Sequence, residues 1–338
     1  MLKVIFAVCS LALALAQPGV AQSLGANRGD VAGSGGGRSI QGRIVFASGT
    51  PPATSVRITL ETSDSGTRTT FADQDGAFIF NNLAAGPYQL TVNAGKEYEV
   101  AREHIMIEGP APVYQLPIYL KLNPETNPAF AGTPKGAIEL YGKGVEAADK
   151  GDSKKAAELF EQAVKLHPTF LMALTGLGLQ YMKLGQMERA ADTYRAILNL
   201  KDNDANGHLN LGIALYNLST TSLTEKKADE ANQRLAEAAN HLQQAIRLSS
   251  RGPNAHYYLG LVFIRVRKYS DAQSEMESAL SNGGENLAPV HKYLGGLYMS
   301  AKRNNEAADQ LEKYLQLDPK AKEAEQIRTT IKDLRSKH

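Results

Sequence analysis

The residues whose types and spacing come nearest to metal chemistry are two aspartates followed by a glycine. Asp73 and Asp75 are two positions apart and stand directly before Gly76. An EF-hand calcium loop carries acidic ligands at its first, third and fifth positions, glycine at its sixth and glutamate at its twelfth. With Gly76 as the sixth residue, the first is Phe71 and the twelfth is Asn82, and neither supplies ligand charge. Asp-Gly between two alternating segments is instead typical of a hairpin, so we expect a turn and no bound ion.

The sequence contains no set of side chains typical of catalysis. It has no glycine-rich phosphate loop between a strand and a helix, no HExxH zinc motif and no GxSxG nucleophile motif. Its serines and threonines lack a neighbouring histidine and acid, and its seven histidines do not cluster. We therefore expect a protein that is not an enzyme and that needs no metal or cofactor. An enzyme with an unrecognised site is the least favoured hypothesis.

Length and charge limit the classes of partner. A chain of 338 residues suggests two domains or an array of repeats. A formal net charge of +2 gives no strong field for attracting nucleic acid or an anionic membrane, so we expect no nucleic-acid partner. Tryptophan is absent, which removes the strongest platform for stacking on a sugar ring.

The N-terminal segment has the features of a secretory signal peptide. Lys3 precedes an apolar run at 4–16, and small residues with cleavage spacing follow at either 14–16 or 19–21. A membrane-spanning helix needs about 20 apolar residues, so we favour a signal peptide at residues 1–21 over an uncleaved anchor, with no transmembrane segment after cleavage. The only cysteine, Cys9, lies in this run, and export without disulfides is typical of a bacterial envelope protein. We expect an exported protein that is periplasmic, outer-membrane-associated or secreted.

The next part of the chain alternates with a period of two. Residues 22–37 are rich in glycine and serine and are expected to form a flexible leader. Beyond them Val56, Ile58 and Leu60 share one face of a strand, which is typical of a sheet with one buried side. Such alternation predicts an all-β sandwich over 38–122, with about seven strands at 42–46, 55–61, 67–72, 77–80, 87–92, 98–107 and 113–120.

A motif inside this region carries a family resemblance. The pattern D-G-x-F-x-F-x-x-L-x-x-G-x-Y-x-L-x-V is formed by Asp75, Gly76, Phe78, Phe80, Leu83, Gly86, Tyr88, Leu90 and Val92. It resembles the carboxypeptidase regulatory-like, transthyretin-like sandwich, and the resemblance implies a non-catalytic accessory domain. The following segment, 123–135, contains three prolines, which favour an extended linker and a domain boundary.

After the linker the period changes to that of a helix, and a longer repeat is added to it. Glycines recur at spacings of 34, 34, 48 and 35 residues, and alanines of a second helix recur in parallel. The L-G-x-x-Y, A-x-x-x-F and final proline pattern resembles the tetratricopeptide repeat. This resemblance implies five helical hairpins over 136–319, stacked into a solenoid with a concave groove, and a capping helix at 320–338. The fold class is therefore a β-sandwich followed by an all-α tetratricopeptide solenoid.

Two departures from the repeat pattern lead to further predictions. The third repeat carries 14 extra residues near 220–233, and Ser222 with Glu225 would form a capping box there. We expect the insert to lengthen the second helix of that hairpin, either as a solvated extension or as a prong that contacts a partner. Histidines at one repeat position, His208, His256 and His291, lie too far apart for a metal site, so we expect each ring to pack with one partner.

The repeats imply a surface for binding proteins. In the tetratricopeptide family the concave groove is lined by five positions of each first helix, and a Lys/Asn clamp for chaperone tails is replaced here by Tyr141 and Val145. We expect an exported scaffold or adaptor that binds protein or peptide in an envelope complex. The alternative is a cell-surface polysaccharide-binding protein led by the sandwich. The candidate groove residues are Asn206, Tyr216, Asn217, Asn254, Tyr257, Arg265 and Lys292.

Overall fold

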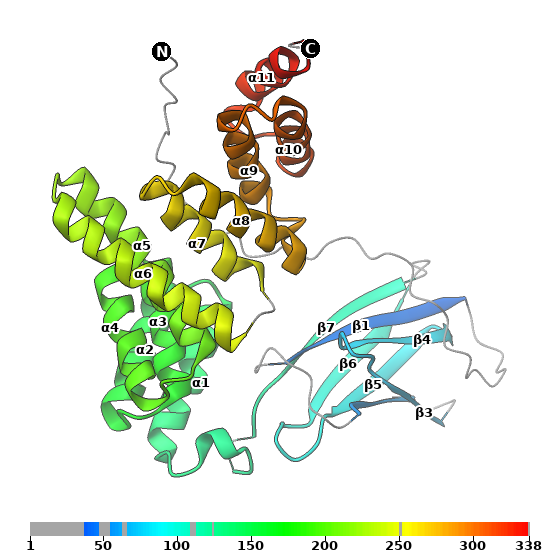
Figure 1. The fold of residues 1–338 in the computed structure, drawn as a ribbon. Helices are drawn as coiled ribbons and strands as arrows, with labels where there is room; N and C mark the ends of the chain where they lie inside the picture. Colours follow the sequence, from blue (N-terminus) through cyan, green and yellow to red (C-terminus); the bar gives the residue numbers. More distant parts are fainter. Residues whose placement is uncertain are drawn as a thin grey trace. The chain divides into compact units, whose positions relative to one another are not determined.

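The computed structural model describes residues 37–46, 55–62, 66–108, 113–123, 125–249 and 252–336. The chain divides into two compact units between Thr133 and Pro134, and each unit is described by itself (Figure 1). The predicted signal peptide at 1–21 lies outside the described residues, as does the leader up to residue 36.

The first unit is a sandwich of two sheets, as the sequence predicted. Among the described residues it has seven strands, which form a three-stranded sheet in the order β4-β1-β7 and a four-stranded sheet in the order β3-β2-β5-β6. Strands β1 and β7 pair in parallel, and all the other pairs are antiparallel. The strands are β1 (Arg38–Phe46), β2 (Arg57–Thr62), β3 (Gly66–Phe71), β4 (Ala77–Leu83), β5 (Gly86–Asn93), β6 (Ala101–Ile107) and β7 (Val113–Leu120).

The alternating residues of the motif fill the space between the two sheets. Leu60 on β2 faces Leu90 on β5, and both side chains are buried. Phe78 and Phe80 on β4 are buried with their rings in an edge-to-face arrangement. Gly42 on β1 lies beneath Phe78, and a Cβ at this position would overlap the phenyl ring. The apolar residues of the motif are therefore core residues of the sandwich rather than parts of a binding site.

The Asp-Gly segment forms the expected turn, but the prediction of a hairpin is wrong. Strand β3 pairs with β2 whereas β4 pairs with β1, so the turn carries the chain from one sheet to the other. The carboxylate of Asp73 accepts hydrogen bonds from the backbone N–H of Asp75 at 2.9 Å and of Ala77 at 2.8 Å. Gly76 has φ +79°, and a Cβ there would lie 2.5 Å from the carbonyl oxygen of Ile44. Asp73 therefore stabilises the turn with the same carboxylate that a calcium ion would require.

The segment that follows the sandwich is not the extended linker that its prolines predicted. The backbone N–H of Asn123 donates to the carbonyl oxygen of Glu97 at 2.9 Å, and the Asn127 side chain donates to the same oxygen at 3.2 Å. A short 3-10 helix, η1 (Pro128–Phe130), begins after Asn127. Proline is accommodated at the start of a helix because no backbone donor is needed there. The segment therefore belongs to the first compact unit up to Thr133, and the second unit begins at Pro134.

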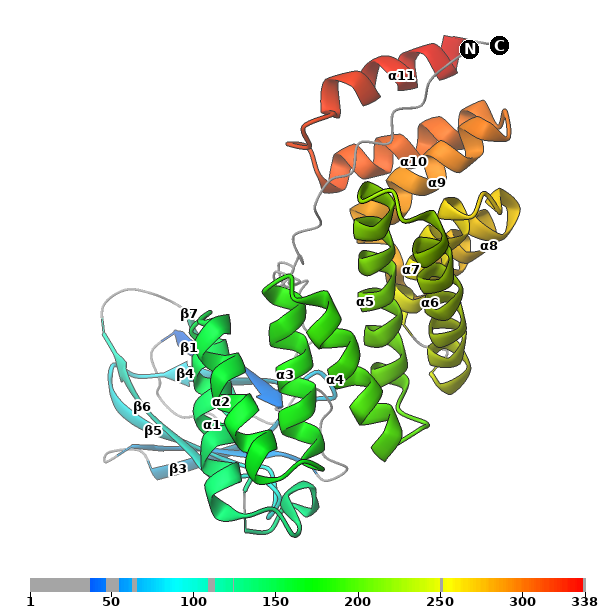
Figure 2. The same cartoon turned by 90° about the vertical axis from the view of Figure 1, so that its left-hand side faces the viewer.

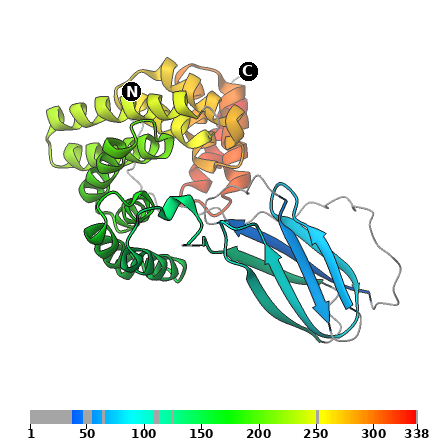
Figure 3. The same cartoon turned by 90° about the horizontal axis from the view of Figure 1, so that it is seen from below.

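The second unit is a series of helical hairpins, and Figure 3 shows that its helices follow an arc from green through yellow to red. Among the described residues, five pairs of helices pack as hairpins, and a last helix packs on the fifth pair. None of the helices among the described residues is long and apolar enough to cross a membrane. The helices are α1 (Lys135–Asp149), α2 (Ser153–Leu166), α3 (Leu171–Lys183), α4 (Met187–Leu200), α5 (Ala205–Thr224), α6 (Ala228–Leu248), α7 (Pro253–Arg265), α8 (Tyr269–Ala279), η2 (Leu280–Gly284), α9 (Ala288–Ser300), α10 (Asn304–Leu317) and α11 (Ala324–Ser336).

The glycine of each first helix lies against a large side chain of the second helix. A Cβ at Gly178 would lie 2.7 Å from the ring of Tyr194, which is 1% exposed. The same relation holds in the other hairpins, so the repeated glycine lets the two helices approach closely. The remaining pairs are Gly144 with Phe160, Gly212 with Leu242, Gly260 with Met276 and Gly295 with Leu311.

The insert lengthens both helices of the third hairpin, and the prediction that only the second helix would grow is wrong. Helices α5 and α6 have 20 and 21 residues, whereas α3 and α4 have 13 and 14 (Figure 2). Ser222 lies inside α5 with 1% exposure, and its hydroxyl donates to the carbonyl oxygen of Leu218 at 3.2 Å, so it forms no capping box. Arg234 of α6 donates to the same carbonyl at 3.0 Å and to Ser222 Oγ at 2.8 Å. Each helix of this hairpin is therefore seven residues longer than its counterpart in the second hairpin. Because seven residues make about two helical turns, the sides of α5 and α6 that face each other stay in register.

Candidate functional site

Three of the predicted groove residues come together in the structure. Tyr216 lies on α5, while Tyr257 and Arg265 lie on α7, the first helix of the next hairpin. Tyr216 packs edge to face with Tyr258 at a centroid distance of 6.0 Å, and Tyr258 packs in the same way on Tyr257 at 5.1 Å. Tyr257 also contacts Tyr293 of α9 at 6.2 Å. We call these four tyrosine side chains the tyrosine cluster.

Two hydroxyl groups of the tyrosine cluster, those of Tyr257 and Tyr258, are held in the neutral form. Tyr216, Tyr257 and Tyr258 are 9%, 6% and 7% exposed. Burial raises the pKa of the Tyr258 phenol to about 12, with smaller contributions from Tyr216 and Tyr293. Burial also raises the pKa of Tyr257 far above its usual range, and its three neighbours add to the effect. These two hydroxyls therefore keep their protons near neutral pH and can donate hydrogen bonds.

Arg265 lies beside one ring of this cluster. Its guanidinium carbon is 6.0 Å from the centroid of the Tyr216 ring, and the side chain is partly buried. Within the described part of the chain, no carboxylate lies within ion-pair distance of Arg265. Several other arginines of the repeats are paired, for example Arg189 with Glu161 at 2.9 Å. A cation that is held on an aromatic ring and left unpaired is available to an anionic group from outside.

The predicted asparagines do not join the cluster as hydrogen-bonding partners. Asn217 donates its side-chain amide to the carbonyl oxygen of Ile213 at 3.0 Å, one turn back on α5. Asn206 and Asn254 are exposed near the starts of α5 and α7. Their amides face solvent and are free to contact a bound chain.

Lys292 has a structural role that the sequence did not indicate. Its ammonium group pairs with the carboxylate of Glu323 and lies 5.7 Å from the centroid of the Tyr314 ring. The Tyr314 hydroxyl donates to the same carboxylate at 3.0 Å. The hydrogen bond from Lys292 is the main cause that holds the pKa of Glu323 below its usual range. Lys292 thus connects α9 to the segment that precedes the capping helix α11.

The repeated histidines connect the two helices of a hairpin. His208 Nδ1 lies 2.8 Å from His241 Nδ1, and the corresponding nitrogen of His256 lies 2.7 Å from Glu275 Oε2. His291 Nδ1 likewise lies 2.7 Å from Gln310 Oε1. Each ring nitrogen named here has a partner, which lies on the second helix of the hairpin. His208 and His291 differ from the prediction of one partner each, because their Nε2 atoms also lie 2.9 Å from the carbonyl oxygens of Asp202 and Glu285. No group of three potential metal ligands occurs in the part of the chain that the structure describes.

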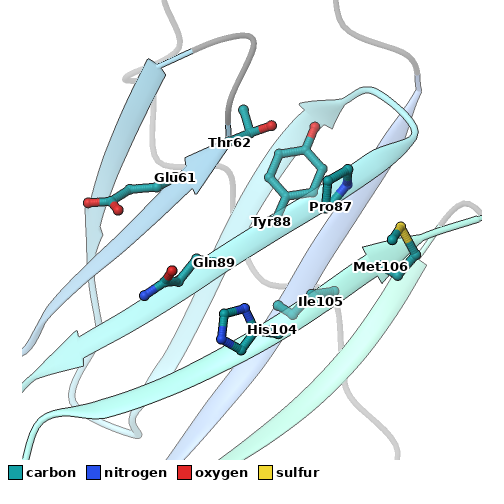
Figure 4. A pocket seen from close by; sticks show the side chains of 8 residues that line it. All are labelled: Glu61, Thr62, Pro87, Tyr88, Gln89, His104, Ile105 and Met106. Atoms are coloured by element: carbon teal, nitrogen blue, oxygen red, sulfur yellow. The ribbon is translucent and has the colours of Figure 1, made fainter.

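A second surface lies on the outer face of the four-stranded sheet. A shallow pocket of about 490 Å³ is lined by Glu61, Gln89 and His104, with Pro87 and Met106 beside them (Figure 4). Glu61 faces Gln89 across β2 and β5, and Gln89 faces His104 across β5 and β6. The three polar side chains therefore form one row across neighbouring strands.

Comparisons with known proteins agree with both units. A model of the carboxypeptidase regulatory-like domain matches residues 39–120. Tetratricopeptide repeat models match residues 141–208, 231–266 and 260–322.

Relatives are also found among proteins of known name. Photosystem I assembly protein Ycf3 of a Synechococcus strain is 30% identical over 121 residues, which cover 35% of this chain and 70% of that protein. The protein of the same name from Parasynechococcus marenigrum is 31% identical over the same shares of both chains. The solved structure of a thermophilic tetratricopeptide repeat protein from Thermus thermophilus covers 59% of this chain and 98% of its own, with 24% identity and a TM-score of 0.46. The glycine-centred hairpins, the family models and the sequence relatives together show that the chain belongs to the tetratricopeptide repeat family and carries an N-terminal carboxypeptidase regulatory-like domain.

Proposed function

We propose that this chain is a non-enzymatic scaffold that binds protein or peptide partners along the first helices of its repeats. The observation that carries the proposal is the tyrosine cluster with Arg265, which spans three successive first helices, α5, α7 and α9. Tyrosine and arginine are enriched at the centres of protein interfaces because they combine large contact areas with polar atoms.

The proposal also places the scaffold in a bacterial cell envelope after export. The apolar run at 4–16 and the position of Cys9 inside it support export without disulfides. The relatives are named for assembly of photosystem I. We take from them only the general role and assign to this chain the assembly or maintenance of an envelope complex.

A peptide selection tests the binding surface. The purified full chain is screened against a random library of extended peptides, and the selected peptides are titrated against two double variants. Asn206→Glu with Asn254→Glu changes exposed residues of the proposed surface, and Asn240→Glu with Gln243→Glu changes exposed residues of α6. We expect binding to weaken at least about tenfold in the first variant only, as for the loss of an interface contact. Failure to select any peptide, or equal binding by both variants, contradicts the proposal.

The pocket on the sheet favours carbohydrate binding as a second candidate function. Glu61, Gln89 and His104 can hydrogen-bond sugar hydroxyls, and Pro87 and Met106 offer apolar surface to a sugar ring. A glycan array with the full chain and its Glu61→Gln variant tests this candidate. Glycans retained by the native chain and lost by the variant support it, and an array without retained glycans rejects it.

A further inference from the structure

The partly buried Arg265 has a charge that nothing in the described chain neutralises. Two other arginines of the repeats have carboxylate partners. Arg195 pairs with Glu237 at 2.9 Å, and Arg234 pairs with Glu230 at 2.6 Å. These two arginines are also partly exposed, at 44% and 22% of their side-chain areas. Arg265 instead lies over the Tyr216 ring, which orders the side chain without satisfying its hydrogen-bond donors.

Three hydroxyls of the tyrosine cluster are also donors with no acceptor in the described part of the chain, and the ring that carries one of them, Tyr216, lies 6.0 Å from the Arg265 guanidinium carbon. No hydrogen bond from the hydroxyls of Tyr216, Tyr257 and Tyr258 to any described residue occurs. Among the described residues, the buried side-chain polar atoms that have neither solvent contact nor a hydrogen bond are Gln180 Oε1 and Tyr194 Oη. The three tyrosine oxygens are not in this group, so they reach solvent. A partly buried cation that lies beside a tyrosine ring and has no carboxylate partner among the described residues matches the needs of a carboxylate, and the phenol hydroxyls are further donors of the same cluster.

We propose that Arg265 and the tyrosine cluster form a subsite for the side-chain carboxylate of an aspartate or glutamate in a bound peptide. The inference rests on the proposed function and names the chemistry of its partner. Bidentate pairing by the guanidinium group would hold the carboxylate. The hydroxyl of Tyr216, whose ring lies 6.0 Å from the guanidinium carbon, would donate to a remaining lone pair.

The surroundings favour a carboxylate in the middle of a peptide over a terminal one. The first helices continue on both sides of Arg265, from α5 to α9, so a bound chain can pass the subsite in both directions. Lys292 is the candidate groove cation on α9. It already pairs with Glu323, so it is not available as a second cation that would bind the terminal carboxylate of a peptide.

The test uses peptides selected by the full chain, synthesised with an amidated C-terminus, and measured by fluorescence anisotropy. Each acidic residue is replaced in turn by its amide, Glu by Gln or Asp by Asn. We expect one replacement to weaken binding by about tenfold to a hundredfold, the usual effect of losing a charge-assisted hydrogen bond. In the Arg265→Gln variant the same replacement should have no effect, whereas in Arg265→Lys part of the effect should remain. Tyr216→Phe, which keeps the ring, should weaken binding of the acidic peptide only.

Arg247→Gln is the matched control, because Arg247 is exposed at the end of α6, which is a second helix of its hairpin. Circular dichroism of each variant confirms that it is folded. The inference is wrong if selected peptides bind Arg265→Gln as tightly as the native chain, or if acid-to-amide replacement has the same effect in both. It is also wrong if only peptides with a free C-terminal carboxylate bind. In these cases peptides are still selected, so the proposed function survives. A selection that yields no peptide overturns the proposed function itself.

Discussion

At the scale of single residues, the repeated glycines and histidines have structural roles that their spacing predicted. Gly178 leaves room for the Tyr194 ring, and His256 contacts Glu275 of the second helix. The binding residues were less predictable. Tyr216, Tyr257 and Arg265 follow from the family's groove positions, but Tyr258 and Tyr293 lie outside those positions and join through ring contacts across hairpins. Such contacts depend on how the hairpins stack, which periodicity does not specify.

Replacing Gly178 by alanine should destabilise the repeats. The added methyl group would meet the Tyr194 ring at 2.7 Å, and overpacking a core costs about 1–3 kcal/mol. Gly142 of α1 is the matched control, because no atom lies within 4 Å of a Cβ at that position. Alanine at Gly142 should be neutral or stabilising by up to about 1 kcal/mol. Thermal unfolding of both full-length variants measures the difference, and equal midpoints would refute the packing role.

Protonation of His241 should make stability depend on pH. Burial, followed by the neighbouring His208, lowers the pKa of His241 below its ordinary value of 6.5, with Glu237 opposing and Arg195 assisting the shift. The unfolded chain therefore binds more protons than the folded chain just below pH 6.5, and the free energy of unfolding falls as the pH drops through that range. His241→Gln should reduce this slope. Urea unfolding at about pH 7.5 and about pH 5.5, on either side of the ordinary histidine pKa, measures it. An unchanged slope in the variant contradicts the assignment.

At the scale of helices and strands, element types were predictable and their pairing was less so. The alternation of Val56, Ile58 and Leu60 identified a strand, but it did not show that the turn at Asp73 connects two sheets. Pairing is decided by contacts between distant segments. The insert was misassigned for a related reason: Ser222 fits a capping box locally, yet packing against Arg234 continues α5 through it. Tertiary contacts outweighed the local signal.

The register of the long hairpin can be tested by deletion. Removing 218–224 together with 228–234 takes about two turns from each helix and should leave the apolar faces aligned. It also removes Arg234 with both of its acceptors on α5, so no donor is left unpaired. Removing 220–224 with 230–234 instead rotates each helix by about 140° at about 100° per residue. We expect the first deletion to retain a cooperative thermal transition and the second to lose it; similar behaviour of the two would contradict the register argument.

At the scale of the whole molecule, the repeats form a linear array whose junctions carry polar links. The Tyr181 hydroxyl donates to Glu161 of the preceding hairpin at 2.6 Å, and the Tyr298 hydroxyl donates to Glu277 at 2.8 Å. An array of this kind is stabilised by contacts between neighbouring repeats and exposes a long surface for partners. The sandwich adds a second unit with its own core and its own exposed pocket.

Export is the prediction that concerns the whole chain most directly. The protein isolated from its native cells should lack its first 16 or 21 residues, according to which small-residue site is cleaved. Mass spectrometry of the intact protein, with cell fractionation, measures this. A chain that keeps Met1–Ala16 and is recovered with cytoplasmic markers would contradict export.

The central claim is that the first helices of the repeats hold a partner, and site-specific photo-crosslinking in intact cells tests it most directly. A photoreactive amino acid replaces Asn217 on α5, next to Tyr216 of the tyrosine cluster, and in a second strain it replaces the exposed Gln243 on α6. The account predicts discrete crosslinked products from position 217 and none from position 243, with the 217 products reduced by the added change Arg265→Gln. Products from position 243 alone, or from neither position, would contradict the account.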